Sequence, residues 1–157
     1  MDTNIVITGM GAVTPIGIGI DAYWNGLISG VHGIGPITHF DASGLPVQIA
    51  AEVKDFQPTA YMSPKLAKEM DTFMQYGYAA AEEAMQDAGL HPESPELLPV
   101  AAERVGIVVG TAFAGIATIA DTQNGISTGQ YTRVSPRFVP KVIGNIAAAQ
   151  IAIAKGL

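Results

Sequence analysis

Two short apolar runs that each stop at a glycine constrain the fold of this chain more than any other feature. Residues 4–8 (Asn-Ile-Val-Ile-Thr) stop at Gly9, and residues 105–110 (Val-Gly-Ile-Val-Val-Gly) end in a glycine of their own. Runs of this length that are rich in β-branched residues are typical of buried strands. Between them, apolar residues at three- and four-residue spacing predict a long helix over 64–88. This alternation indicates part of a layered α/β sheet, for which two strands are too few.

Capping residues mark where the expected helices begin and end. Ser63 and Pro64 stand where the long helix should start, and Gly89 stands where it should end. The other expected elements are a short helix with Asp21 as its N-cap and Gly30 at its end, a last helix over 141–154 ended by Gly156, and an edge strand or hairpin arm at 47–51. No element is assigned to residues 121–136, which are polar and rich in glycine.

Cysteine is absent from the 157 residues, and histidine occurs only three times. These counts exclude disulfides, thiolate nucleophiles and iron–sulfur ligands within the chain, as well as sites that need several cysteines and histidines. His32, His39 and His91 lie in surroundings typical of loops, so none is nominated as a general base. We expect no metal site and no cofactor. An apolar fraction of 48% with 14% charged residues indicates a packed domain.

The charge and hydropathy pattern excludes further classes of function. The net charge is −6, and no basic stripe could neutralise several phosphates, which argues against nucleic-acid binding. No apolar run reaches the roughly 18 residues of a membrane span. The N-terminus lacks the basic region of a signal peptide. We therefore expect a soluble, cytoplasmic protein without a membrane partner.

Two small basic groups interrupt the otherwise acidic sequence. Lys65 and Lys68 are three residues apart, so they share one face of the expected long helix. Arg133, Arg137 and Lys141 form the second group. Each group is either ordinary surface charge or an electrostatic landing site for an acidic partner.

A Gly9-x-Gly11 pair follows the first expected strand, as it does in a dinucleotide-binding turn. That fingerprint requires a third glycine where this chain has Thr14, and no acidic residue ends a second strand at the right distance. We therefore interpret the pair as a tight strand exit that packs closely against a neighbouring backbone.

Several segments, taken in order, resemble the β-ketoacyl-[acyl carrier protein] synthases, the condensing enzymes of fatty-acid and polyketide synthesis. The segments are Ile-Val-Ile-Thr-Gly-Met-Gly-Ala-Val-Thr-Pro-Ile-Gly at 5–17, Trp24, Ile-Thr-His-Phe-Asp-Ala-Ser at 37–43, Ala-Glu-Val-Lys-Asp-Phe at 51–56, Met-Asp-x-Phe-x-Gln at 70–75, Ala-Met-Gln-Asp-Ala-Gly-Leu at 84–90, Val-Ser-Pro-Arg-Phe-Val-Pro at 134–140 and Asn-Ile-Ala-Ala at 145–148. The resemblance covers essentially the whole chain and is strongest to the type II elongating enzymes.

The resemblance implies a thiolase-like fold, in which two similar β/α halves form a layered α-β-α-β-α body that dimerises. Residues 1–157 would then be an incomplete N-terminal ketosynthase domain, with the family's nucleophilic Cys, two His and one Lys beyond Leu157. The implied reaction is the decarboxylative Claisen condensation of malonyl-ACP with an enzyme-bound acyl thioester in fatty-acid elongation, with acyl carrier protein (ACP) as partner. The isolated chain is expected to be inactive. The alternative is a polyketide ketosynthase or a non-catalytic subunit resembling a chain-length factor.

The resemblance also implies roles for particular residues. The acyl-pocket positions are Phe113, Ile116 and Phe138, and the carrier-docking positions are Lys65, Lys68 and Arg133. Phe113 matches the residue that gates the acyl pocket, where many type II relatives have a smaller aliphatic side chain. Its bulk predicts a preference for shorter acyl primers, unless Phe113 is simply a core residue. Type II members commonly have an aromatic residue at the position of Arg137. Whether this position contacts the partner subunit is therefore left open.

Overall fold

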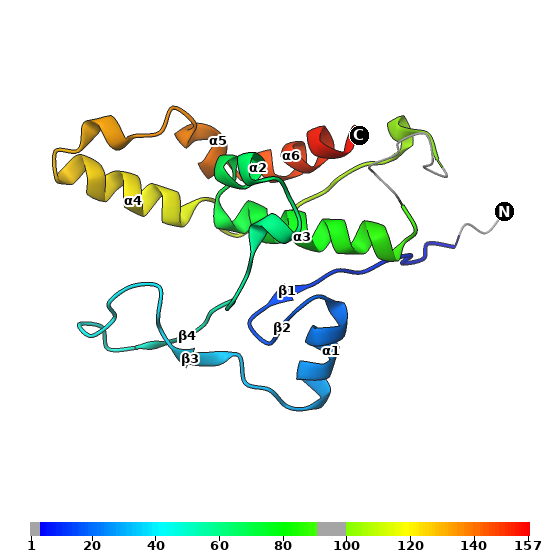
Figure 1. Ribbon diagram of the computed structural model, residues 1–157, viewed down its shortest axis with the longest axis horizontal. Coiled ribbons are helices and arrows are strands. Elements are labelled where there is room, and N and C mark those ends of the chain that lie inside the picture. The colour runs from blue at the N-terminus through cyan, green and yellow to red at the C-terminus, as the bar shows by residue number, and fades with distance from the viewer. Residues whose placement is uncertain (1–3, 91–99) are drawn as a thin grey trace.

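The computed structural model describes residues 4–90 and 100–157 (Figure 1). Its elements, with η denoting a 3-10 helix, are β1 (Val13–Thr14), β2 (Gly17–Ile18), α1 (Ile20–Ile28), β3 (Ile34–Pro36), β4 (Ile49–Ala51), η1 (Pro58–Ala60), α2 (Pro64–Glu69), α3 (Thr72–Asp87), η3 (Ala102–Arg104), α4 (Ile116–Ser127), η4 (Tyr131–Arg133), α5 (Phe138–Val142) and α6 (Ile146–Lys155). Helix α3 lies at the centre, with α2 and α6 along one side and β1, β2 and α1 along the other (Figure 1).

The long helix expected over 64–88 is two helices. Helix α2 begins as predicted, because Ser63 Oγ accepts a hydrogen bond from the Leu66 N–H at 3.2 Å. Met70 then adopts extended backbone angles, and the Asp71 carboxylate accepts from the Phe73 N–H at 3.3 Å to cap α3. The apolar spacing runs through this break, so periodicity alone could not reveal it. Gly89 follows α3 with a φ of +67°, which confirms the predicted end.

The Gly9-x-Gly11 segment packs directly on α3, as predicted from the missing third glycine. A Cβ atom on Gly9 would lie 2.1 Å from the Ala84 carbonyl oxygen, and one on Gly11 would lie 2.0 Å from that of Ala80. Only glycine permits such an approach. The Asp87 carboxylate also accepts a hydrogen bond from the Met10 N–H at 2.9 Å. Backbone contact and a carboxylate of α3 together hold this segment on the helix.

Helix α1 begins one residue earlier than Asp21, so the prediction of Asp21 as its N-cap is wrong. Gly19, with a φ of +91°, takes the N-cap position. The first free N–H of the helix, that of Ile20, donates to Glu83 on α3 at 2.6 Å. Glu83 also accepts from the Ala12 N–H at 2.9 Å. The helix start is therefore capped by a side chain that is distant in sequence. The predicted end is confirmed, because Gly30 follows α1 with a φ of +65°.

The described sheets are two antiparallel hairpins. Strand β1 pairs with β2, and β3 pairs with β4, which confirms the hairpin arm expected at 47–51. Residues 4–8 and 105–110 belong to no sheet in the described part of the chain, although both were expected as strands. A strand requires hydrogen bonds to a neighbouring strand, and no described segment supplies one.

Residues 105–110 keep the side-chain alternation of a strand even without a partner. Ile107 and Val109 pack against the core, whereas Val108 between them is 98% exposed. The first expected strand is open to solvent as well, because Ile5 is 97% exposed. The run was predicted as a buried strand from its β-branched residues, but only one of its faces is covered by the helices.

The core lies between α2, α3 and α6. Its buried members are Met62, Ala67, Met70, Met74, Tyr78, Ala147 and Ile151. Met74 on α3 is the most completely buried large side chain of the described residues. Helix α6 starts at Ile146 and ends before Gly156, whose φ of +67° confirms the predicted end. Of its expected first part, residues 141–142 belong to the separate helix α5, and residues 143–145 lie between the two helices. None of the described helices is long and apolar enough to cross a membrane.

Candidate functional site

The segments that carry the three predicted acyl-pocket residues lie side by side. Gly115, with a φ of +60°, approaches α5 so closely that a Cβ there would lie 2.6 Å from the Lys141 carbonyl oxygen. A Cβ on Gly144 would likewise lie 2.9 Å from Cγ2 of Thr111. The turn over 111–115 is therefore fixed against the end of α5.

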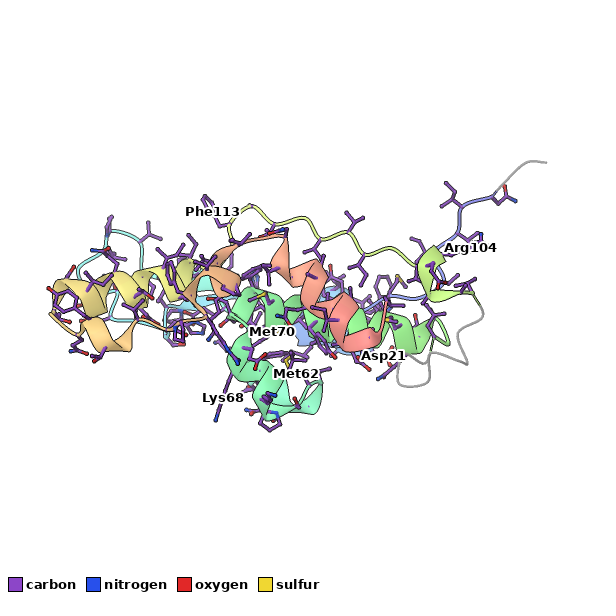
Figure 2. The ribbon with its side chains drawn as sticks, turned by 90° about the horizontal axis from the view of Figure 1, so that it is seen from above. Asp21, Met62, Lys68, Met70, Arg104 and Phe113 are labelled. Atoms are coloured by element: carbon purple, nitrogen blue, oxygen red, sulfur yellow. The ribbon has the colours of Figure 1, made fainter. Side chains whose placement is uncertain are left out.

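Phe113, Ile116 and Phe138 themselves differ in exposure. Phe113 is 76% exposed, and its side chain points away from the body of the molecule (Figure 2). Ile116, the first residue of α4, is 55% exposed, and Phe138, the first residue of α5, is half-buried. Phe113 is thus no core residue within this chain. That these three residues line an acyl pocket stays a prediction.

Asp71 fixes the start of α4 next to Ile116. Its carboxylate is buried, and besides capping α3 it accepts hydrogen bonds from the Thr118 N–H at 3.2 Å and from the Thr118 hydroxyl at 2.5 Å. One carboxylate therefore ties together the N-terminal ends of two helices. We assigned no role to Asp71 from the sequence, although it belongs to the Met-Asp-x-Phe-x-Gln segment.

A buried ion pair joins α3 to the last turn of α6. Lys155 Nζ donates to the Glu82 carboxylate, which also accepts from Gln86 Nε2 at 3.1 Å. Lys155 Nζ lies 5.3 Å from the centre of the Tyr78 ring. Burial by itself would lower the pKa of Lys155, but the hydrogen bond to Glu82, the negative charge of Glu82 and the contact with Tyr78 together raise this pKa above its ordinary value of 10.5. No sequence pattern around Lys155 predicted that it would form a buried ion pair.

The predicted docking lysines are both exposed, but they line different hollows. Lys65 lines a hollow of about 300 Å³ between α2 and α6. Lys68 lines a second hollow, of about 450 Å³, together with Lys141 of α5. Arg133 ends η4, and its side chain lies outside the described residues. Arg137 forms an ion pair with Glu69 of α2. Among residues 4–90 and 100–157, no three His, Asp or Glu side chains gather as a metal site would require.

Comparison with known proteins assigns this chain to a family. Residues 2–157 match the family described as "Beta-ketoacyl synthase, N-terminal domain". The chain is 39% identical over 154 residues to the 3-oxoacyl-[acyl-carrier-protein] synthase 2 of Vibrio harveyi. That match covers 98% of this chain and 36% of the relative. The chain thus spans about a third of the length of the curated relatives that it matches.

Solved structures share the fold. The ishigamide ketosynthase/chain length factor superposes with a TM-score of 0.75 at 28% identity, over 96% of this chain and 36% of that one. A type II polyketide ketosynthase, solved in complex with its acyl-carrier protein and bound to the hexaketide, gives a TM-score of 0.73 at 24% identity, over 96% of this chain and 39% of that one. The predicted thiolase-like fold is confirmed. The chain belongs to the β-ketoacyl synthase family and carries its N-terminal domain.

Proposed function

We propose that this chain is the N-terminal part of a 3-oxoacyl-[acyl carrier protein] synthase, which elongates fatty acids by condensing malonyl-ACP with an enzyme-bound acyl thioester. The observation that carries the proposal is the 39% identity to a curated synthase of this activity over 98% of the chain. The order and spacing of the family segments support it, because each of them is present in sequence order from residue 5 to residue 148.

The covalent chemistry belongs to the part of the protein that residues 1–157 do not include. A condensing enzyme of this kind accepts the acyl group on a cysteine thiolate, and this chain contains no cysteine. The domain is therefore incomplete, and the isolated chain is catalytically inactive. Decarboxylation of malonyl-ACP then yields a carbanion that attacks the thioester carbonyl, and the oxyanions that develop need donors from the same absent part.

The contribution of residues 1–157 is to position the substrate and its carrier. Phe113, Ile116 and Phe138 line the acyl pocket in this proposal, and the close packing of the turn over 111–115 on α5 supports their grouping. Phe113 fills space that a long acyl tail would need, so the enzyme prefers short primers. The whole enzyme is a cytoplasmic homodimer.

ACP docks on Lys65, Lys68 and Arg133 in this proposal. The exposure of both lysines on an otherwise acidic chain supports it, because opposite charge accelerates the encounter with an acidic partner. Reversing both charges, Lys65→Glu with Lys68→Glu, should raise the KM for acyl-ACP relative to the KM for a small acyl thioester. An equal change in both constants would contradict the docking role.

Acyl transfer to the protein tests the proposed function. The longer protein that contains these residues is incubated with butyryl-ACP, and its intact mass is then measured. The mass should rise by one butyryl group, whereas the isolated 157-residue chain should stay unchanged. Acylation of the isolated chain would contradict the assignment of the nucleophile to the absent part. A longer protein that never becomes acylated would instead fit the non-catalytic chain-length-factor alternative.

A further inference from the structure

One hollow on the surface brings together two lysines from helices that are far apart in the sequence. Lys68 lies in the last turn of α2, and Lys141 lies in the last turn of α5. Both line the same hollow of about 450 Å³, together with Thr59 and Gln75. Figure 2 shows Lys68 pointing outward on the side of the molecule opposite to Phe113. The family resemblance gave only Lys68 a docking role, whereas Lys141 belonged to the second basic group of the sequence.

The surroundings leave both ammonium groups without a counter-ion in the described part of the chain. The described salt bridges are Arg137 with Glu69 and Lys155 with Glu82, so neither Lys68 nor Lys141 has a carboxylate within 4.0 Å among these residues. Glu69 is the one acidic residue of α2, and Arg137 already occupies it. Both lysines also stand at helix C-terminal ends, where the helix dipole favours a positive charge.

The two lysines are held in place rather than brought together by chance. The ion pair of Glu69 with Arg137 connects α2 to the start of α5, one residue after Lys68 and four residues before Lys141. The backbone of Lys141 is fixed from the other side, because its carbonyl oxygen lies against Gly115. Two like charges at one hollow repel each other, and an anion between them relieves that repulsion.

We propose that Lys68 and Lys141 form a single site for a carboxylate side chain of the carrier protein, so that α5 belongs to the docking surface as well as α2. The inference rests on the proposed function, and it adds Lys141 to the docking residues. A protein carboxylate fits because its negative charge offsets the charges of the two lysines. The chain as a whole is acidic, with a net charge of −6, so an acidic partner is attracted only where basic residues gather.

Binding of fluorescently labelled apo-ACP to the whole enzyme, followed by anisotropy, tests this site. Lys141→Glu should weaken the Kd by about tenfold and Lys141→Gln by about threefold, with the larger effect at low salt. Lys54→Glu is the matched control, because it makes the same change in net charge at an exposed lysine outside the hollow. It should change the Kd by less than about twofold. Combining Lys68→Glu with Lys141→Glu should cost less than the product of the single effects, since both lysines bind one anion.

Two results would overturn the inference. One is a Kd for Lys141→Glu equal to that of Lys54→Glu. The other is a loss seen only with holo-ACP, which would make the anion the phosphate of the prosthetic group rather than a carboxylate. Neither result affects the proposed function. That function fails separately if the unaltered enzyme condenses no acyl-ACP, whatever Lys141 does. Thermal unfolding of each variant, compared with that of the unaltered enzyme, verifies that the variants are folded.

Discussion

Glu82 and Lys155 are 73 residues apart in sequence and form an ion pair that is buried between α3 and α6. The side chains retain only 9% and 7% of their exposure. Lys155 Nζ also lies over the Tyr78 ring, so three side chains fix the last turn of α6 on the central helix. A buried pair of this kind is costly to break because the remaining charge has no water to solvate it.

Removing one partner should therefore destabilise the protein much more than removing both. Lys155→Met leaves the Glu82 carboxylate buried and unpaired, and we expect a loss of about 3 kcal/mol in the free energy of unfolding. The double variant Glu82→Leu with Lys155→Met removes both charges and should lose less than half as much. Urea unfolding of the unaltered protein, the single variants Lys155→Met and Glu82→Leu, and the double variant measures these losses. Equal losses for the single and double variants would contradict a coupled buried pair.

The same pair predicts how stability depends on pH. The pKa of Lys155 is raised in the folded protein, so its contribution to stability is complete below the unfolded pKa of 10.5 and is lost as the pH rises through the higher folded value. The difference in unfolding free energy between the unaltered protein and Lys155→Met should stay constant below pH 10.5 and shrink as the pH rises above this value. A difference that grows with pH would mean that Lys155 is not stabilised in its charged form.

Replacing glycine by alanine should have opposite effects on the free energy of unfolding in the N-terminal segment and in α3. Gly11→Ala places a Cβ 2.0 Å from the Ala80 carbonyl oxygen, so the backbone must shift, and we expect a loss of about 2 kcal/mol or more. Gly77→Ala is the matched control, because a Cβ there meets no atom within 4 Å and alanine favours a helix. It should stabilise the protein by about 0.5 to 1 kcal/mol. Thermal unfolding that ranked the two variants the other way would contradict the packing of the Gly9-x-Gly11 segment on α3.

The sequence predicted this packing, but it did not predict the features that depend on distant partners. The missing third glycine at Thr14 was enough to infer a close backbone approach. In contrast, the N-cap of α1 was misplaced because Glu83, far along the chain, supplies the hydrogen bond to Ile20. The break at Met70 was hidden because the apolar spacing continues on both sides of it. Local patterns report local preferences, whereas a cap supplied by another helix leaves no local trace.

The candidate site was predictable only in part, because some of its features also depend on contacts between distant elements. The resemblance identified Phe113, Ile116 and Phe138, and the structure places their segments in contact, although the proposed pocket stays a prediction. The resemblance implied a docking role for Lys68 but not for Lys141, because the two lysines share a hollow only once α2 and α5 are packed together. Helix α4 was missed as well. Its sequence is polar and contains glycine, and Asp71 from another helix secures its start.

Acyl-chain preference offers a test of the role of Phe113. Replacing Phe113 by Ile in the complete enzyme should raise the rate with long acyl-ACP relative to short acyl-ACP, because the smaller side chain leaves room for a longer tail. Phe40→Ile is the control, since Phe40 is also exposed but lies in the loop between β3 and β4. Steady-state rates with acyl-ACP of increasing length measure the ratio. An unchanged profile in Phe113→Ile would exclude Phe113 from the acyl pocket.

The most direct test of the central claim follows the carbon atoms of malonyl-ACP. The complete protein is incubated with unlabelled acyl-ACP and malonyl-ACP labelled with ¹³C at all of its malonyl carbons, and the products are analysed by mass spectrometry. Decarboxylative condensation predicts a 3-oxoacyl-ACP that is two carbons longer and carries two labelled carbons, with the third released as ¹³CO₂. A folded protein that binds ACP but yields no elongated product would contradict the account.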